Sequence, residues 1–238
     1  MLIKQQTMNN DLSNKSCLEC SEKSLCFNHL TEKELLAIDE NKVVLKYKKG
    51  EIIAKQGAFV PQILYLQKGL VKVYKELNDN ENLVLTIFPN GSLIGLPSLY
   101  SVSKMEYSVA ALVDSVICAI DKQLFEKFIK DNGDFAAAVI SSMNSCLLYN
   151  FSKIISLTHK QMNGRLAEAL LFLSDVIYKS DEFRMVLSRK DIAEFTGMSV
   201  MSVVRALKDF KENQIITDEN GVIKIINREK LMKISVTG

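Results

Sequence analysis

The chain has 238 residues, of which 47% are hydrophobic and only three are prolines. This length and composition can bury one or two hydrophobic cores, so the sequence predicts two folded domains. No apolar run approaches the roughly 20 residues of a membrane span, and the N-terminus lacks a hydrophobic signal region, so we expect a cytoplasmic protein. The net charge is +2, with 12 Lys and Arg against 11 Asp and Glu from residue 161 onward. Bulk charge is therefore only weak evidence for nucleic-acid binding, because a strongly basic face is the usual sign of it.

Three cysteines lie close together near the N-terminus, after a polar segment at residues 1–14 that we expect to be frayed. Cysteines in a cytosolic chain point to metal binding, redox chemistry or burial before structural disulfides. Cys17, Cys20 and Cys26 are near enough to converge on one metal ion or cluster. With His29 they form a local Cys3His set, so structural zinc is the alternative ligand.

The middle of the chain predicts an antiparallel β-roll. Thr31 and Glu34 make a capping box for a short helix at residues 30–39. Short β-rich runs separated by turns then extend to Asp121, a pattern typical of a barrel or roll. The predicted strands are Val43–Tyr47, Glu51–Ala54, Ile63–Gln67, Leu70–Lys75, Asn82–Phe88, Tyr107–Leu112 and Ser115–Ile120.

Helical periodicity replaces the strand pattern after Asp121. A short helix at Gln123–Lys130 precedes a long one from Asp134 to about Thr158, and a further amphipathic helix covers Arg165–Tyr178. One face of the long helix is apolar apart from one asparagine. A single polar residue in an apolar seam can fix the register of paired helices, so we expect this face to be a dimer interface. The alternative is that it packs on the roll. This stripe comprises Val139, Met143, Cys146, Asn150, Ile154 and Leu157.

Residues 188–209 have the spacing of a helix-turn-helix. Ser188 and Asp191 form a capping box, Gly197 allows a tight turn, and Ser199 caps a second helix. Outward positions on that helix are candidate DNA readers, a plain helical hairpin being the alternative. The predicted DNA contacts are Ser188, Arg189, Ser199, Val200, Met201, Ser202, Arg205 and Lys208.

A β-hairpin is predicted directly after these helices. Two β-branched runs, Gln214–Thr217 and Val222–Ile226, flank a turn that contains Asn220 and Gly221. A hairpin in this position is a wing, which can contact the DNA backbone beside the groove that the helix reads.

The predicted architecture is therefore α+β in four segments. Residues 1–30 are a cysteine-rich segment, 31–130 a β-roll sensor domain, 131–160 a dimerisation helix, and 161–238 a winged helix-turn-helix DNA-binding domain. An enzyme is disfavoured because the only histidines, His29 and His159, lie in no nucleophile motif, and the chain has no phosphate loop or convincing carboxylate pair.

This order of segments resembles the Crp/Fnr superfamily of bacterial transcription regulators over roughly residues 17–234. The resemblance implies a jelly roll like that of cyclic-nucleotide-binding domains, a homodimer, a palindromic double-stranded DNA operator and RNA polymerase as partner. The features that carry it are the turn Lys68-Gly69, the glycines of GSLIG at Gly91 and Gly95, the stretch Arg165-Leu166-Ala167, and the helix-turn-helix.

Within that superfamily the cysteines are similar to those of the FNR (fumarate and nitrate reduction) oxygen-sensing type. That type has three N-terminal cysteines at gaps of two and five residues and a fourth in a late strand of the roll. The resemblance implies a [4Fe-4S] cluster that oxygen or nitric oxide dismantles, which gates dimerisation and DNA binding. The matching residues are Cys17, Cys20, Cys26 and Cys118.

The roll departs from the cyclic-AMP-binding relatives at their ribose and phosphate positions. Ser92 follows Gly91 where those relatives have glutamate, and Tyr107-Ser108 stands where they have an Arg-Ser pair. A cyclic phosphate would lack its charged partner, so we expect a different effector. The alternatives are a Crp/Fnr regulator with structural zinc or no metal that responds to another small ligand, and a regulatory module that acts on a protein without binding DNA.

The recognition helix and the dimer stripe also depart from the resemblance. Met201 replaces a family glutamate, whereas Arg205 keeps a family arginine suited to guanine. We therefore expect an operator that differs at the base the glutamate would read. Asn150 stands where the FNR type has aspartate, and a neutral amide lacks like-charge repulsion, so we expect dimerisation to be less strictly tied to the cluster.

Overall fold

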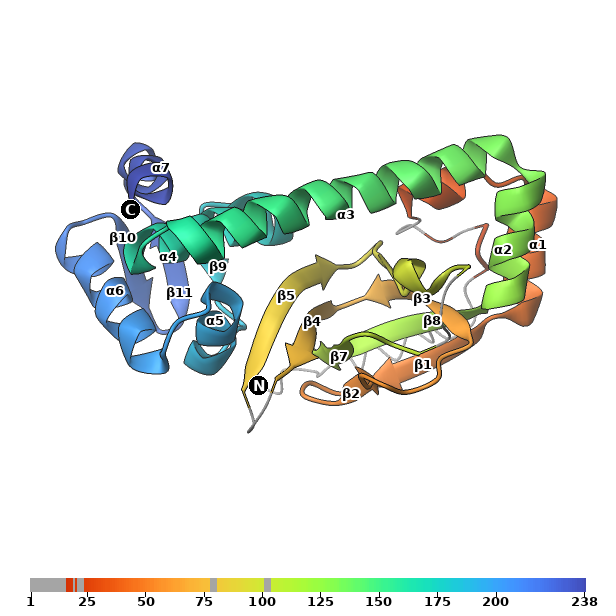
Figure 1. Cartoon of the computed structure of the whole chain (residues 1–238), viewed down its shortest axis with the longest axis horizontal. Helices are drawn as coiled ribbons and strands as arrows, with labels where there is room; N and C mark the ends of the chain where they lie inside the picture. The colour runs from red at the N-terminus through yellow and green to blue at the C-terminus, as the bar shows by residue number, and fades with distance from the viewer. Residues whose placement is uncertain (1–15, 19, 21–23, 78–80, 101–103) are drawn as a thin grey trace, which may run out of the picture.

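The computed structural model describes residues 16–18, 20, 24–77, 81–100 and 104–238 (Figure 1). The frayed segment expected at residues 1–14 lies outside these ranges. The described chain forms a β-roll with helices at one end, a long connecting helix, and a smaller C-terminal domain at the other end of that helix. The predicted α+β class is confirmed.

The roll is a sandwich of two four-stranded sheets whose paired strands are all antiparallel. All seven predicted strands are present, and the structure adds a short strand, Leu93–Ile94, which is too brief to show a periodicity. One sheet has the order β1 (Val43–Tyr47), β8 (Ser115–Asp121), β3 (Gln62–Lys68), β6 (Leu93–Ile94). The other has the order β2 (Ile52–Ala54), β7 (Ser108–Ala111), β4 (Leu70–Glu76), β5 (Asn82–Pro89).

Strand alternation determines which side chains of β8 face the interior of the sandwich. Ile117 and Ala119 lie in the core between the two sheets. Cys118 and Ile120 lie in a second core, on the outer face of the same sheet. Side chains of a strand point alternately to opposite faces, so the backbone of β8 places the Cys118 thiol outside the sandwich and beneath the N-terminal segment.

A helical layer covers that outer face. It consists of a short 3-10 turn η2 (Leu25–His29), α1 (Glu32–Asn41), α2 (Lys122–Asp131) and the start of α3 (Gly133–His159). Phe27 of η2 joins the layer to the sheet and to α3, because its ring lies 5.3 Å from that of Tyr65 and 6.4 Å from that of Phe135. The N-terminal segment is thus packed between the roll and the long helix.

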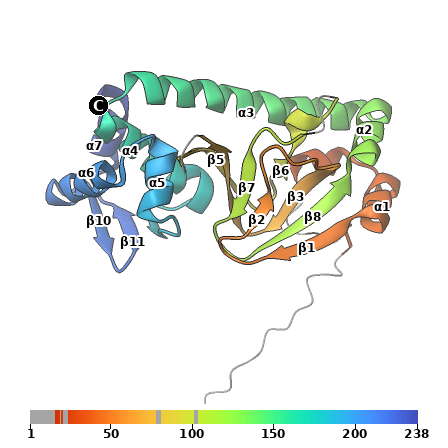
Figure 2. The same ribbon diagram turned by 60° about the horizontal axis from the view of Figure 1, so that its bottom comes forward.

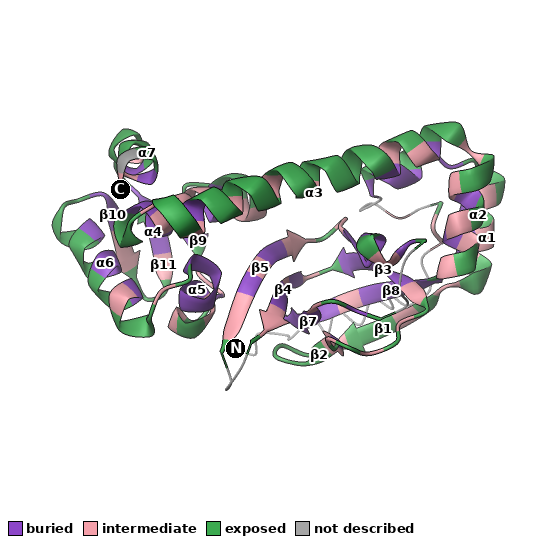
Figure 3. Ribbon diagram, viewed as in Figure 1, coloured by how far each residue is buried: buried purple, intermediate pink, exposed green. Residues whose placement is uncertain are grey.

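Helix α3 has 27 residues and connects the two domains over about 40 Å. It begins at Gly133 and ends at His159, close to the predicted limits. Its outer side is exposed for most of its length (Figure 3). Among the described residues, no helix has both the length and the apolar character needed to cross a membrane.

The C-terminal domain places two short helices beside a small sheet. The helix predicted for residues 165–178 is α-helical only to Phe172, where α4 (Met162–Phe172) continues as a π-helical turn, Leu173–Tyr178. The domain ends in α7 (Arg228–Thr237), which was not predicted, and α7 packs on α4. The remaining elements are β9 (Glu182–Arg184), α5 (Arg189–Thr196), α6 (Val200–Glu212), β10 (Ile216–Glu219) and β11 (Val222–Ile225).

The predicted wing is confirmed as the hairpin β10–β11. Asn220 and Gly221 take positive φ values of 52° and 78° at its turn, the conformation that two-residue hairpins favour and that Asn-Gly supplies. The structure adds β9 as a third strand, paired with β11.

The C-terminal domain docks on the second sheet of the roll (Figures 1 and 2). Leu70 and Tyr74 of β4 and Ile87 of β5 share one apolar core with Ile192 and Phe195 of α5. Both outer faces of the sandwich are therefore covered: one by the cysteine-bearing segment and its helices, the other by the helix-turn-helix.

Candidate functional site

Helices α5 and α6 form the helix-turn-helix with the predicted caps. Ser188 Oγ accepts from the Asp191 N–H at 3.1 Å, and the Asp191 carboxylate accepts from the Ser188 N–H, which completes the capping box. Ser199 caps α6 by accepting from the Ser202 N–H at 3.1 Å. Gly197 has φ 61°, a left-handed conformation that favours glycine, and its Cα faces the end of the Leu157 side chain on α3.

The outward face of α6 is exposed where DNA contacts are predicted. Val203 and Leu207 are buried against α5, whereas Val200, Met201, Arg205 and Lys208 are exposed and Ser202 is half-buried. Met201 is 61% exposed, which is unusual for a large apolar side chain on a folded domain and fits a surface that contacts another molecule.

A groove with three basic side chains runs between α6 and the wing. It is lined by the basic residues Arg189, Lys208 and Lys211, by the acidic residues Glu212 and Asp218, and by Val204 and Leu207. Arg189 forms an ion pair with Asp218 at 2.6 Å, so the start of α5 is tied directly to the wing. Cations in this position can contact phosphates beside a groove that α6 reads.

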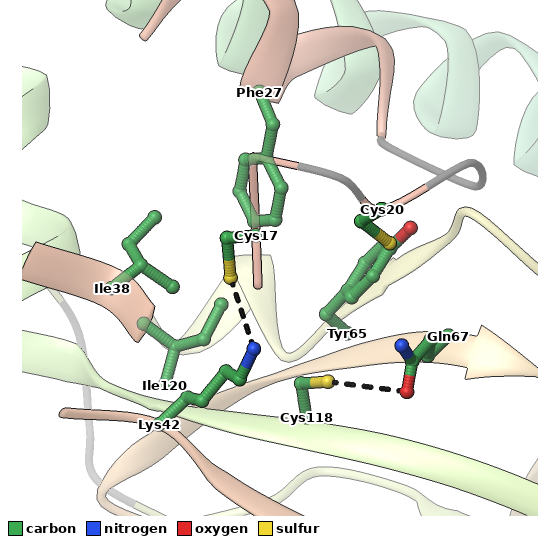
Figure 4. A pocket seen from close by; sticks show the side chains of 9 residues that line it. All are labelled: Cys17, Cys20, Phe27, Ile38, Lys42, Tyr65, Gln67, Cys118 and Ile120. Atoms are coloured by element: carbon green, nitrogen blue, oxygen red, sulfur yellow. Dashed lines mark hydrogen bonds between the residues drawn. The ribbon is translucent and has the colours of Figure 1, made fainter. Parts of the chain in front are cut away.

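Three of the four predicted cluster ligands line one cavity (Figure 4). Cys17 and Cys20 enter it from the N-terminal segment and Cys118 from β8, and Lys42 and Tyr65 complete much of the wall. The cavity has a volume of about 20 Å³, which is room for about one water molecule.

The fourth predicted ligand points elsewhere. Cys26 is buried and its Sγ donates to the Ala138 carbonyl of α3 at 3.5 Å. His29, the alternative zinc ligand, is exposed and does not line the cavity. Cys146, the remaining cysteine, is half-buried on α3.

The cysteine thiols have the chemistry and the location to bind a metal group, but in this structure their sulfur atoms are too far apart to do so. Among the described residues, no group of three or more His, Cys, Asp and Glu side chains is close enough to hold a metal ion. Burial raises the pKa of Cys17 and Cys26, and raises that of Cys118 to about 11, so these thiols are protonated near neutral pH. Metal binding would have to displace these protons and move the Cys17–Cys20 loop and Cys26 toward Cys118.

Asp39 and Lys42 contact Cys17, although no sequence motif marked them as part of the cysteine site. Lys42 Nζ donates to Cys17 Sγ at 3.3 Å, and Asp39 Oδ1 accepts from the Cys17 N–H at 3.1 Å. Both lie at the C-terminal end of α1, some 20 residues from Cys17. Only the three-dimensional path of the N-terminal segment brings them together.

Tyr107-Ser108, which the sequence resemblance places where cyclic-AMP-binding relatives hold the phosphate, is hydrogen-bonded within the chain. Ser108 is fully buried, and its Oγ donates to the Glu76 carboxylate at 2.5 Å while it accepts from the Gln56 N–H at 2.9 Å. Burial raises the pKa of the neighbouring Tyr107 to about 12. A carboxylate beside Ser108 would repel a phosphate placed there, and the exclusion of cyclic AMP as effector stays a prediction.

The structure divides the predicted dimer stripe between two faces of α3. Val139 is buried against the roll, Cys146 is half-buried, and Leu157 contacts the helix-turn-helix at Gly197, whereas Met143, Asn150 and Ile154 are exposed. Further large apolar side chains are exposed along the helix and did not belong to the stripe. These are Ile140, Leu147, Leu148, Phe151 and Ile155.

Comparison with known families assigns both domains. Residues 44–132 match the model of the cyclic nucleotide-binding domain, and residues 164–234 match the Crp-like helix-turn-helix domain. The fumarate and nitrate reduction regulatory protein of Vibrio cholerae is 23% identical over 92% of this chain and 90% of its own length. The anaerobic regulatory protein of Bacillus subtilis is 28% identical over 78% of this chain and 81% of its own length.

Solved structures show the same fold. FixK2 from Bradyrhizobium japonicum superposes with a TM-score of 0.76 at 20% identity, over 83% of this chain and 98% of that one. A CooA mutant from Carboxydothermus hydrogenoformans gives a TM-score of 0.72 at 20% identity, over 90% of this chain and 96% of that one.

An exposed recognition helix with a wing, attached to a sensor-type roll, defines a DNA-binding transcription regulator and not an enzyme. More narrowly, the chain belongs to the Crp/Fnr family, as its sequence resemblance predicted.

Proposed function

We propose that this regulator is a homodimer whose affinity for DNA is set by a [4Fe-4S] cluster held by Cys17, Cys20, Cys26 and Cys118. The observation that carries the proposal is the shared cavity, in which two thiols of the N-terminal segment meet Cys118 of the roll. The names of the Vibrio and Bacillus relatives, which refer to fumarate and nitrate reduction and to anaerobic regulation, support an effector linked to oxygen.

The cluster would supply reactivity toward oxygen or nitric oxide, and the chain supplies the link to α3. Cys26 and Phe27 belong to η2, which packs on the start of α3 through Ala138 and Phe135. Binding of Cys26 to the cluster would break its contact with Ala138 and would shift η2 relative to α3. The state of the cysteine site is thereby coupled to the helix whose outer face remains free for a second protomer.

The dimer presents two copies of α6 to DNA. A two-fold dimer of helix-turn-helix domains reads two half-sites one helical turn apart, so the operator is palindromic. The exposed side chains of Val200, Met201 and Arg205, together with the half-buried Ser202, read the bases, and Arg189 and Lys208 contact the backbone. The protein then acts in the cytoplasm, with RNA polymerase as the partner that transmits its effect.

The test is the oligomeric state and DNA affinity of protein purified without oxygen, measured before and after exposure to air. Light scattering gives the mass, and fluorescence anisotropy with a duplex from the native promoter region gives the affinity at one fixed salt concentration. We expect a dimer with tight DNA binding before exposure and at least tenfold weaker binding afterwards, with a smaller loss of dimer than of DNA affinity because the neutral Asn150 brings no like-charge repulsion.

Cys118→Ala tests whether the response depends on the cysteine site. We expect this variant to behave before exposure as the native protein does afterwards. Equal DNA affinity before and after air would contradict gating by oxygen. Failure to bind any promoter duplex in either state would instead favour a module that acts on a protein partner.

A further inference from the structure

Cys17 is fixed to the C-terminal end of α1 by two residues, Asp39 and Lys42. The Asp39 carboxylate accepts from the Cys17 N–H at 3.1 Å and from Lys42 Nζ at 2.5 Å. Lys42 in turn donates to Cys17 Sγ at 3.3 Å, and its ammonium points at that sulfur inside the cavity (Figure 4). These three contacts form a closed triangle around one predicted ligand.

The Lys42 ammonium is held almost out of water beside the cavity. Its side chain is only 9% exposed, and that of Asp39 is 26% exposed. Taking a lysine ammonium out of water carries a large desolvation penalty, which the ion pair with Asp39 and the hydrogen bond to Cys17 help to offset. The same wall of the cavity is otherwise apolar, formed by Phe27, Ile38 and Ile120, so a hydrophobic side chain would satisfy the packing at this position.

An ammonium beside thiols has a specific use when a metal group is bound. Thiolate ligands are anionic, and hydrogen bonds to their sulfurs help to set the stability and reduction potential of iron–sulfur clusters. Groups that orient and hydrogen-bond a ligand usually contribute a factor of about 10–100 to metal affinity. Lys42 offers both a positive charge and an N–H donor to the sulfur of Cys17.

We propose that Asp39 and Lys42 are positioning residues of the cysteine site. Asp39 holds the main chain of Cys17 and orients Lys42, and Lys42 donates to the ligand sulfur and offsets its negative charge. This inference rests on the proposed function for its metal-bound part. The anchoring of Cys17 by Asp39 is present in the metal-free chain and is tested there separately.

The first experiment measures hydrogen exchange of the Cys17 amide in the full-length, metal-free protein. We expect exchange to be at least tenfold faster in Asp39→Ala than in the native chain. The double variant Asp39→Ala/Lys42→Met removes both charges, leaves no lone buried ion, and should show the same loss of protection. Lys48→Met is the matched control, because Lys48 is exposed and pairs with Asp114 far from the cavity. Unchanged exchange in both Asp39 variants would overturn the anchoring role.

The second experiment measures iron release to a chelator, without oxygen, from chains reconstituted with iron and sulfide. We expect release about 10–100-fold faster from Lys42→Met, little change for Lys42→Arg, which keeps the charge and the donors, and none for Lys48→Met. The visible absorption band should also shift in Lys42→Met, since a ligand sulfur has lost its donor. Native release rates and spectrum in Lys42→Met would overturn the role of Lys42. If the native chain takes up no iron, the cluster assignment and the role of Lys42 toward it fail together, while the exchange experiment still decides the anchoring by Asp39.

Discussion

At the scale of single residues, the recognition helix presents an apolar side chain, Met201, where the sequence resemblance leads us to expect a glutamate. Val200 and Met201 are exposed at the N-terminal end of α6, the end that reaches base edges in helix-turn-helix proteins. They can contact thymine methyl groups but cannot accept from the amino group of cytosine. Arg205, one turn further along the helix, keeps the geometry for a guanine.

Met201→Glu should therefore alter base preference and leave the fold unchanged. A carboxylate at this position gains a hydrogen bond with cytosine and loses the apolar contact, which corresponds to about 1–3 kcal/mol of discrimination at one base pair. Binding to a set of operator duplexes that differ at single positions measures the change. Met232→Glu is the matched control, since Met232 is similarly exposed but lies on α7. Identical preferences in Met201→Glu and the native protein would remove Met201 from the reading face.

At the scale of elements, β4 and α5 are joined by a buried ion-pair network. Lys72 of β4 contacts Asp191 at 2.6 Å and Glu194 at 3.2 Å, and Asn82 donates to Glu194 at 3.3 Å. Asp191 is also the capping-box residue of α5, so one carboxylate serves the start of the helix-turn-helix and its attachment to the roll. The network couples the sensor domain to the position of the DNA-binding helices.

Lys72→Met should destabilise the chain by about 2–4 kcal/mol near neutral pH, because it leaves the half-buried Asp191 without its cation and leaves the buried Glu194 with only the 3.8 Å contact to Lys190 as an ion pair. Chemical denaturation measures the loss. Lys75→Met on the same strand is the control, and it should cost about 0.5 kcal/mol or less because the Lys75–Glu106 pair is exposed. Equal stability of the two variants would show that the network does not support the docking.

The cost of Lys72→Met should also depend on pH. Burial alone would raise the pKa of Asp191, but the hydrogen bonds from Lys72 and Ser188 outweigh it and hold that pKa below its ordinary value. A carboxyl group with a lowered folded-state pKa contributes its full stability above the unfolded value of about 3.9, and loses it as the pH falls through the folded value. The difference between native and Lys72→Met chains should therefore be largest near pH 7 and shrink as the pH falls, first as the carboxyl that has lost Lys72 takes up a proton in the variant, and finally through the lowered pKa of Asp191 in the native chain.

The fold was predictable from the sequence where a local pattern repeats along the chain. It was not predictable where contacts between distant segments determine the structure. Long strands and N-caps have local signals, whereas the two-residue strand β6 has too few positions to show one. Helical periodicity predicted an apolar stripe on α3, but α3 has two apolar faces, and only the structure shows that Val139 and Leu157 face their own chain. Cys118 could be identified as a candidate ligand only by resemblance to a family. Lys42 could be placed beside Cys17 only once the path of the N-terminal segment was known.

At the scale of the whole molecule, α3 offers an apolar surface that no part of the described chain covers (Figure 3). Its exposed side chains recur every three or four residues, the spacing of a helix that packs against another helix. A contiguous apolar surface of this kind marks an interaction site, and the two-fold partner proposed above fits it.

Leu147→Asp should disrupt the dimer. Burying one leucine contributes about 1.5–3 kcal/mol, and a two-fold dimer contains the substitution twice, so the dissociation constant should rise at least about a hundredfold. Sedimentation of the oxygen-free protein measures it. Leu36→Asp is the control, because Leu36 is exposed to a similar extent on α1. A native dissociation constant in Leu147→Asp would place the dimer interface elsewhere.

The central claim, a cluster bound through Cys118 as well as the N-terminal cysteines, is tested most directly by metal analysis. Protein and its Cys118→Ala variant are purified without oxygen, and iron, sulfide and zinc are measured together with the visible spectrum. We predict about four iron and four sulfide per chain, with a broad absorbance that bleaches in air and is lost in Cys118→Ala. About one zinc per chain, bound equally by both proteins, would contradict the account.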